Sequence, residues 1–193
     1  MSVLDIPRSF KYCLNTQINR FILRLRGACY GANFRTRGRI LVRGTGSIKL
    51  GDYVTINSCL ESNPIGGDTK SVLFAKNDGK IVIGNRVGIS NSAIVAIDNI
   101  SIEDNVFIGG GCRIYDHDFH SLEYEDRVIG TDSNVLSAPV QIKEGAFIGA
   151  GSIILKGVTI GCHSVIGAGS VVAKDVPNNE IWAGNPARFI KSI

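Results

Sequence analysis

Aliphatic residues recur at every sixth position over the stretch from Val140 to Val176. The repeated positions are Ile142, Ile148, Ile154, Ile160, Ile166 and Val172. The positions four residues further on carry small or β-branched residues, which are Ala146, Ser152, Val158, Ser164, Ser170 and Val176. A period of six matches neither the 3.6 residues of a helix nor the alternation of a simple strand. It is typical of a β-helix built from hexapeptide repeats.

The period has a direct physical meaning. Each hexad supplies one short strand with one inward aliphatic side chain, followed by a tight turn in which glycine tolerates angles that a Cβ disfavours. Three such sides close one triangular coil of about eighteen residues, and each coil buries its faces only by stacking on its neighbours. The sequence therefore predicts a mainly β protein, a parallel β-helix.

The pattern is less regular towards the N-terminus. Leu50 and Ile56 open the first clear hexads, and residues 57–80 break the period with an expected loop, "SNPIGGDTK", and an expected strand, "SVLFAK". A second block of inward positions follows, with one extra residue near Asn99. Its members are Ile83, Ile89, Val95, Ile102, Ile108 and Ile114.

Residues 8–28 show helical spacing instead. Apolar residues recur along one side of a helix, and basic residues supply the polar side. This pattern predicts an amphipathic helix of about 15–18 residues that ends before Gly27 or Gly31. The helix is expected to pack on the first coil or on a partner subunit, and a peripheral position on a membrane is the alternative. We divide the chain into a helical segment, 1–33, and a β-helix domain, 34–193.

Two segments interrupt or follow the coils. The polar stretch 115–138 holds two of the three histidines, and a long loop leaving a compact repeat is usually functional. Residues 177–193 form a C-terminal extension with a turn at Asn185–Pro186 and a short strand or helix.

Composition narrows the range of functions. With 21 Lys+Arg against 17 Asp+Glu the chain is mildly basic, which serves solubility or attracts an anionic ligand but does not reach the density of a nucleic-acid binder. Four arginines from Arg35 to Arg43 crowd the first coil, as a solvated edge or as a contact for an anionic acceptor or partner. Five cysteines without metal-type spacing indicate free thiols in a reducing cytoplasm, and no stretch has the roughly 20 apolar residues of a membrane span.

The stretch "IKEGAFIGAGSIILKGVTIGCHSVIGAGSVVAKDVP", followed by "GNPARFI", resembles the left-handed β-helix acyltransferases, and most of all the branch that O-acetylates sugars. The resemblance covers about residues 40–193. It implies a left-handed coil, acetyl-CoA as cosubstrate without a metal, a carbohydrate acceptor such as a surface polysaccharide or its precursor, and a homotrimer with active sites between subunits.

Acetyl transfer to a hydroxyl needs a base, and histidine suits this role near neutral pH. The candidates are His120 and His117. The resemblance favours His120, because His120-Ser121-Leu122-Glu123 matches the family order, although its distance from Ile114 is one residue longer than usual. A carboxylate that fixes the imidazole is expected from Asp116, Asp118 or Glu123.

The resemblance also implies donor contacts. Turns in "FIGAGS" and "GAGS" would line the coenzyme A groove, and two cations would suit its phosphates. The residues are Gly149, Ala150, Ala168, Lys174 and Arg188, with ordinary coil geometry or a solvated surface as the alternative for each. Asn91 is a candidate contact for the sugar.

Three other functions remain open. A serine acetyltransferase would need a large helical N-terminal domain, which about 30 residues cannot supply. A γ-carbonic-anhydrase-like lyase would need three histidines converging on zinc, whereas two of the three here share one loop. A noncatalytic trimeric scaffold is the third.

Overall fold

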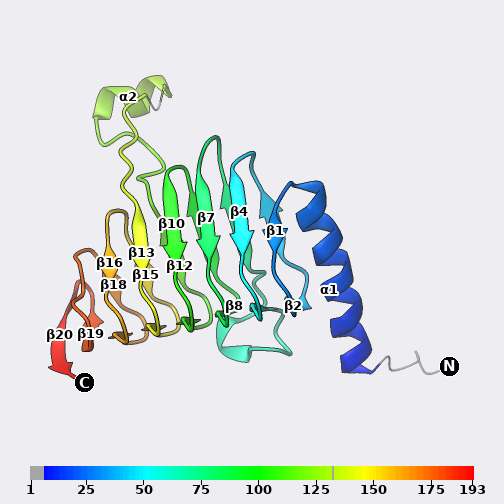
Figure 1. The fold of residues 1–193 in the computed structure, drawn as a ribbon. Coiled ribbons are helices and arrows are strands. Elements are labelled where there is room, and N and C mark those ends of the chain that lie inside the picture. Colours follow the sequence, from blue (N-terminus) through cyan, green and yellow to red (C-terminus); the bar gives the residue numbers. More distant parts are fainter. Residues whose placement is uncertain (1–6, 132) are drawn as a thin grey trace.

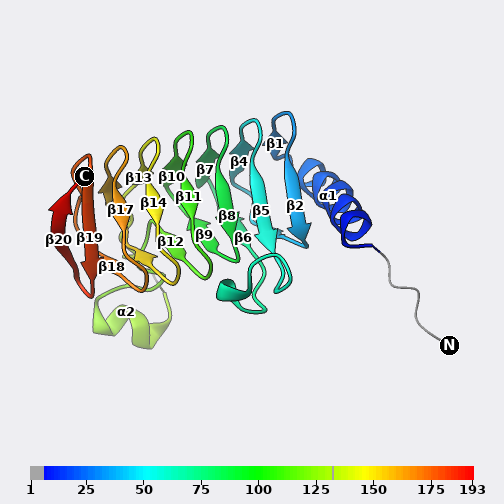
Figure 2. The same cartoon turned by 90° about the horizontal axis from the view of Figure 1, so that it is seen from below.

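The computed structural model describes residues 7–131 and 133–193, which form a three-sided prism of short parallel strands (Figures 1 and 2). Sheet A holds β1 (Cys29–Tyr30), β4 (Ser47–Leu50), β7 (Lys80–Ile83), β10 (Asn99–Ile102), β13 (Val140–Ile142) and β16 (Thr159–Ile160). Sheet B holds β2 (Arg35–Gly38), β5 (Thr55–Ser58), β8 (Gly88–Ser90), β11 (Phe107–Ile108), β14 (Phe147–Ile148), β17 (Val165–Ile166), β19 (Glu180–Gly184) and β20 (Ala187–Ser192). Sheet C holds β3 (Leu41–Arg43), β6 (Val72–Ala75), β9 (Ala93–Ala96), β12 (Arg113–Tyr115), β15 (Ile153–Ile154) and β18 (Val171–Val172).

The chain visits the sheets in the order A, B, C and then rises to the next coil. This gives three edges, which we name by the sheets they join: the AB, BC and CA edges. Successive coils hydrogen-bond in parallel, and the coils form a left-handed β-helix, as expected.

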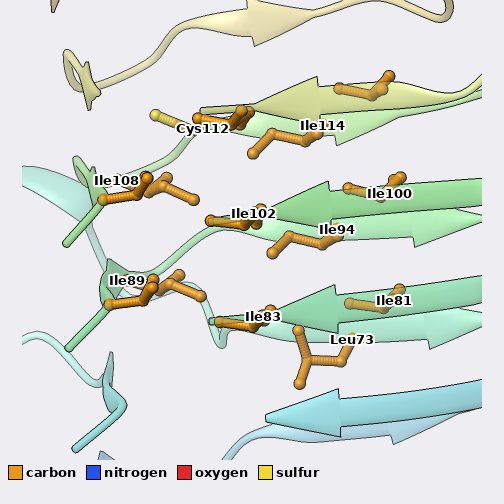
Figure 3. Packing of buried hydrophobic residues seen from close by; sticks show 14 of the residues in the cluster. Leu73, Ile81, Ile83, Ile89, Ile94, Ile100, Ile102, Ile108, Cys112 and Ile114 are labelled. Atoms are coloured by element: carbon orange, nitrogen blue, oxygen red, sulfur yellow. The ribbon is translucent and has the colours of Figure 1, made fainter. Parts of the chain in front are cut away.

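The regular hexads stack as predicted. Ile142 pairs with Ile160, Ile148 with Ile166, and Ile154 with Val172, each partner being eighteen residues further along the chain. All of them are buried, and Figure 3 shows the equivalent columns of aliphatic side chains in the earlier coils. The interior is filled by side chains that repeat from coil to coil, so each coil is stabilised by its neighbours.

One predicted inward position, Val95, was wrong. Ile94 is the inward residue, since it lies between Leu73 and Ile114 in the ladder and is fully buried, whereas Val95 points outward and is partly exposed. The turn after β8 is one residue shorter than the turns after β11 and β14. Asn91 closes it with a φ of +44°, in the left-handed region that asparagine tolerates. The departure from the six-residue period therefore lies in the turn before β9 as well as in the chain after it.

Residues 59–71 leave the BC edge as a loop, with a 3-10 turn at Pro64–Gly66, and the expected strand follows as β6. The Asn63 side chain accepts hydrogen bonds from the backbone of Ile65 and Gly66, which fixes the start of that turn. The extension after the last coil is an antiparallel pair, β19 and β20, which continues sheet B at the C-terminal end.

The predicted N-terminal helix is α1 (Arg8–Leu25), which ends before Gly27 as expected. It lies across the N-terminal end of the prism (Figure 1). Asn19 fixes it there by donating to the Gly38 carbonyl and the Thr36 hydroxyl, while Leu23 enters the common core. Within the described residues no helix has the length and apolarity needed to cross a membrane. The division of the chain at residue 33 stays a prediction.

The polar segment 115–138 projects from the CA edge and carries the short helix α2 (Tyr124–Ile129) (Figures 1 and 2). Its two ends pair through the backbone, because Asp118 donates to Leu136 and Ala138 donates to Asp116. This narrow base holds the outer part of the loop at a fixed place on the edge.

Candidate active site

A buried aspartate–histidine pair stands where β12 leaves the prism. Asp116 is fully buried and His117 is 6% exposed, and the His117 Nδ1 lies 2.9 Å from the Asp116 Oδ1. Asp116 also accepts backbone N–H groups from the previous coil, from Ile97 at 3.0 Å and from Asp98 at 2.9 Å. A carboxylate held by two N–H donors is fixed in place and accepts a hydrogen bond from an Nδ1 that carries the proton. Nε2 is then the ring nitrogen that carries the lone pair.

His117 lines a cavity of about 340 Å³ on the CA edge. The other residues around it are Phe74, Lys76, Asn77, Val95, Ile97, Phe119 and Val135. Phe119 packs on the imidazole with ring centroids 4.4 Å apart, and it adopts a φ of +57°, which is strained for an aromatic residue. Among the described residues, the cavity thus combines an apolar, partly aromatic wall with the Lys76 cation, the Asn77 amide and the imidazole.

The other predicted catalytic residues lie further out on the loop. His120 is exposed, and Glu123 is an exposed residue in extended conformation immediately before α2. The arm that carries them is braced by Ser121, whose hydroxyl donates to Asp126 at 2.9 Å, and by Asn134, whose amide donates to the same carboxylate oxygen at 2.7 Å. The structure therefore places His117 beside Asp116 in the wall of the prism, and His120 and Glu123 on the projecting arm.

Sequence reasoning missed two features of this site. Lys156 forms an ion pair with Asp118 at 2.6 Å, which ties the base of the loop to the next coil. Its signal was available, because Lys156 lies eighteen residues before the predicted phosphate contact Lys174 and occupies the same place on the CA edge. The second is the cavity wall from Phe74 to Asn77, which comes from an earlier coil and has no motif.

The predicted donor turns lie on a different edge. Gly149 is buried and Ala150 half-buried, in the turn between β14 and β15 at the BC edge, and Ala168 is exposed in the equivalent turn one coil later. A Cβ on Gly149 would come 2.5 Å from the Ala168 backbone nitrogen. The stacking of coils alone therefore requires glycine at position 149.

Beneath this turn the Cys112 thiol donates to the Gly149 carbonyl at 3.2 Å, and burial raises the pKa of Cys112. It is a packed, protonated thiol and not a nucleophile.

The remaining predicted contacts are dispersed. Lys174 is exposed on the CA edge, and Arg188 is exposed on β20 at the C-terminal end. Asn91 lies at the BC edge, 3% exposed, where its amide donates to the Thr69 carbonyl at 2.6 Å and holds the loop 59–71, while its Oδ1 is buried without a hydrogen bond in the described part of the chain. Among the described residues no group of three or more His, Cys, Asp or Glu side chains is placed to hold a metal ion.

Sheet C separates the two sets of residues. His117, Lys156 and Lys174 share the CA edge, and Gly149 with Ala168 shares the BC edge. One prism therefore does not bring the imidazole and the donor turns to the same edge.

Comparison with known proteins gives consistent matches. The family model described as bacterial transferase hexapeptide (six repeats) matches residues 139–174, and that of the hexapeptide repeat of succinyl-transferase matches residues 99–114. The Saccharomyces cerevisiae protein named "Putative acetyltransferase YJL218W" is 33% identical over 181 residues, which cover 86% of this chain and 89% of that protein. The galactoside O-acetyltransferase of Escherichia coli is 40% identical over 103 residues, 53% of this chain and 49% of the enzyme.

Two solved structures share the fold at 25% identity. The N-acyltransferase AntD of Bacillus cereus, in complex with dTDP-4-amino-4,6-dideoxyglucose and coenzyme A, gives a TM-score of 0.70 over 90% of this chain and 88% of its own. A hexapeptide-repeat acetyltransferase of Vibrio cholerae, in complex with acetyl-coenzyme A, gives 0.57 over 96% and 86%. The repeat, the prism and the near full-length relative agree, and the chain belongs to the hexapeptide-repeat acyltransferases of the left-handed β-helix fold.

Proposed function

We propose that this protein is an acetyl-CoA-dependent O-acetyltransferase that acts on a carbohydrate hydroxyl. The observation that carries the proposal is the Asp116–His117 pair facing a cavity on the CA edge. Acyl transfer from a thioester to a hydroxyl mainly requires a positioned general base, and the Asp116–His117 pair has the geometry of a general base.

The reaction follows from that geometry. The acceptor hydroxyl lies in the cavity and gives its proton to His117 Nε2 while its oxygen attacks the thioester carbonyl. Asp116 holds the imidazole and stabilises the cation that forms. The tetrahedral oxyanion collapses, the C–S bond breaks, and the thiolate of coenzyme A takes the proton from His117. The products are an acetyl ester and free coenzyme A.

The choice of His117 over His120 rests on position. His117 is held by a carboxylate that is itself held by two backbone N–H groups, and such preorganisation favours catalysis. His120 and Glu123 stay the alternative base and its carboxylate partner, on an arm that could reach a neighbouring molecule.

The acceptor assignment is supported by the cavity and by the relatives. Sugars present apolar ring faces together with hydroxyl groups, and Phe74 and Phe119 with Lys76 and Asn77 offer both kinds of contact. One relative is named for a galactoside, and the AntD structure holds an amino sugar nucleotide. A sugar contact from Asn91 and a cytoplasmic location remain proposals.

The donor site is proposed at the BC edge of one subunit, beside the CA edge of the next. Backbone groups at Gly149, Ala150 and Ala168 would line the pantetheine arm, and Lys174 and Arg188 would contact the phosphates. Because one prism separates its own imidazole from its own donor turns, we infer a homotrimer in which each site uses two subunits.

Acceptor and chemistry are tested together. Purified protein is incubated with acetyl-CoA and a panel of glycosides, sugar nucleotides and amino sugars, with coenzyme A release and acetylated products followed by mass spectrometry. We expect a product that mild alkali deacetylates, since esters are labile and amides are not. An alkali-stable product would replace the hydroxyl acceptor by an amine, and the absence of any acetylated sugar would reject the carbohydrate assignment.

The base is tested by three matched variants. His117→Ala should lower kcat by about 10²–10⁴-fold while coenzyme A binding persists. His120→Ala and His163→Ala should stay near the parent rate, the latter as an exposed histidine on the AB edge. A large loss in His120→Ala with a small one in His117→Ala would transfer the role to His120.

The shared site is tested by mixing two inactive variants. Ala168→Glu places a negative charge in the donor turn, and Ala168 is exposed, so the variant should fold. If each site takes His117 from one subunit and Ala168 from another, equal amounts of His117→Ala and Ala168→Glu, unfolded and refolded together, should regain roughly a quarter of parental activity by random pairing. No recovery in verified mixed trimers would place both residues in one subunit's site.

A further inference from the structure

The N-terminal helix carries an apolar stripe that faces away from the coils. Phe10, Leu14, Phe21 and Leu25 are 59%, 51%, 62% and 70% exposed. Isolated exposed apolar residues are ordinary, but four large ones along a single helix face are not. The stripe therefore indicates a binding surface.

The helix geometry places this stripe opposite the packed face. At about 100° per residue, the four side chains fall within an arc of roughly 60°, centred about 180° from the buried Thr16, Asn19 and Leu23. Figures 1 and 2 show the helix lying across the end of the prism, with its outer side uncovered by the rest of residues 7–131 and 133–193. The coils cannot cover the stripe by any small adjustment.

The same end of the molecule is strongly basic. From Ile6 to Gly51 the sequence has ten Lys or Arg residues and no Asp or Glu, which leaves eleven Lys+Arg against seventeen Asp+Glu, a net of −6, for the rest. The exposed cations of this end are Arg8, Lys11, Arg24, Arg26, Arg35, Arg37, Arg39, Arg43 and Lys49. Lys11 and Arg24 lie on the two sides of the apolar stripe by the same helical geometry.

We propose that this end of the protein docks on an anionic lipid surface, with the stripe of α1 lying in the headgroup region. An apolar face with basic flanks is the pattern of a helix that lies in the membrane interface. The eighteen residues of α1 are too polar to span a bilayer, so the attachment is peripheral. Each Lys or Arg near such a surface strengthens binding by about fivefold.

A second copy of the chain fits the stripe less well. Two such ends brought together would place their basic residues side by side, and the acidic residues near them, Glu61 and Asp52, are too few to offset that charge, which opposes association. An anionic surface neutralises the same charges. In any cyclic assembly of parallel prisms all copies of α1 would lie at one end, so a flat surface could be contacted by every subunit at once.

The test is flotation of the full-length protein with vesicles of phosphatidylcholine, alone or with about a third phosphatidylglycerol. We expect the protein to float with the anionic vesicles, to remain behind with the neutral ones, and to be released as NaCl rises from about 0.05 to 0.5 M. Equal binding to neutral vesicles would overturn the electrostatic part of the proposal, and no binding to either would overturn it entirely.

Matched variants locate the contact. Phe21→Glu and Leu25→Glu should each weaken binding to anionic vesicles by tenfold or more, whereas Ile190→Glu makes the same change at an exposed isoleucine on β20, at the opposite end, and should not. If the Glu variants fail to fold, Phe21→Trp keeps the helix apolar, and its indole emission should shift to the blue on adding anionic vesicles beyond any shift of Trp182 in the parent.

Packing of the stripe on a second copy of the chain predicts different results in the same experiments. If the stripe packs on a second copy, Phe21→Glu should lower the sedimentation mass of the parent oligomer, and the added indole emission of the Phe21→Trp variant should already be blue-shifted without lipid and depend on protein concentration. Either result would reject the lipid surface in favour of an interface between copies. Neither outcome bears on acetyl transfer, which is measured with soluble sugars.

Discussion

Replacing Asp116 by Asn tests the core of the proposed mechanism with the smallest change of shape. In the parent, Asp116 Oδ1 accepts from Ile97 N and faces His117 Nδ1, and Oδ2 accepts from Asp98 N. An amide has one acceptor oxygen and one NH₂ donor, so it cannot reproduce this set. The amide must therefore lose at least one of these hydrogen bonds.

Both orientations of the amide lose a backbone partner. With its nitrogen in the place of Oδ2, the side chain faces the Asp98 N–H donor to donor. With its nitrogen in the place of Oδ1, it opposes the Ile97 N–H and donates to His117 Nδ1, which forces the imidazole proton onto Nε2. One buried N–H left unpaired costs about 1–3 kcal/mol. For a chain of this length that lowers Tm by about 2–12 °C.

The catalytic effect adds to the structural one. The second orientation removes the lone pair from Nε2, and both remove the charge that stabilises the imidazolium, so kcat should fall by about 10²–10⁴-fold with little change in KM. Steady-state release of coenzyme A measures kcat, and thermal unfolding followed by circular dichroism measures Tm.

The matched control is Asp52→Asn. Asp52 also accepts a backbone N–H, from Ala32 at 2.7 Å, but it is exposed on the AB edge and touches no histidine. It should lose some stability and keep its rate. A parental kcat in Asp116→Asn would refute the assignment of Asp116–His117 as the base, and a rate loss of the same size in Asp52→Asn would show that destabilisation alone explains it.

Three further predictions concern the scaffold. Ile148→Ala should lower the free energy of unfolding by about 2–5 kcal/mol in urea denaturation, because the side chain is fully buried between coils; a cost under about 1 kcal/mol would contradict close packing there. Burial raises the pKa of Cys112, so iodoacetamide at pH 8 should label exposed Cys13 in the native protein and Cys112 only after unfolding, as peptide mass mapping would show. The Asn85 backbone N–H and side-chain amide lower the pKa of Asp104, so the contribution of this carboxylate to stability is present above its ordinary pKa of 3.8 and is lost as pH falls below it. Asp104→Asn should therefore be less stable than the parent at pH 7. A difference in stability that persists at pH 2.5 would contradict this linkage.

The regular coils were predictable from the sequence because their cause is local and repeated. An inward residue such as Ile148 meets its own equivalent, Ile166, eighteen residues on, so a match along the sequence is also a contact in space. The amphipathic helix α1 was predictable for a similar reason, since one face packs and the other does not.

Position 95 shows where that logic fails. The β8–β9 turn is one residue short, and hexad counting carried the period across it. The alternation of Ile94 and Ala96, which repeats that of Ile100 and Ile102 on the next strand, was the signal for the correct register. A period-two pattern within one strand outweighs a period-six count across an irregular turn.

The environment of His117 was not open to sequence reasoning. His117 is fixed because Asp116 caps backbone N–H groups of Ile97 and Asp98, in the previous coil. That capping depends on where the chain leaves β12 and on the short base of the loop, neither of which has a motif. The family order of residues pointed to His120, whereas our proposal of His117 as the base rests on its contact with Asp116.

The separation of the predicted donor turns from the proposed base, in contrast, already follows from the period of six. Residues eighteen apart share an edge, so Ala150 and Ala168 form one row and Lys156 and Lys174 another. Ala168 and Lys174 are six apart, and six residues advance the chain by one whole side of the prism. A thioester donor that touches both rows must either cross sheet C or lie between two prisms, where the BC edge of one meets the CA edge of the next. The second arrangement brings the donor turns of one copy next to the imidazole of another without a donor that spans the whole of sheet C, which is why a hexapeptide prism with its histidine loop on the CA edge favours a site made by two copies of the chain.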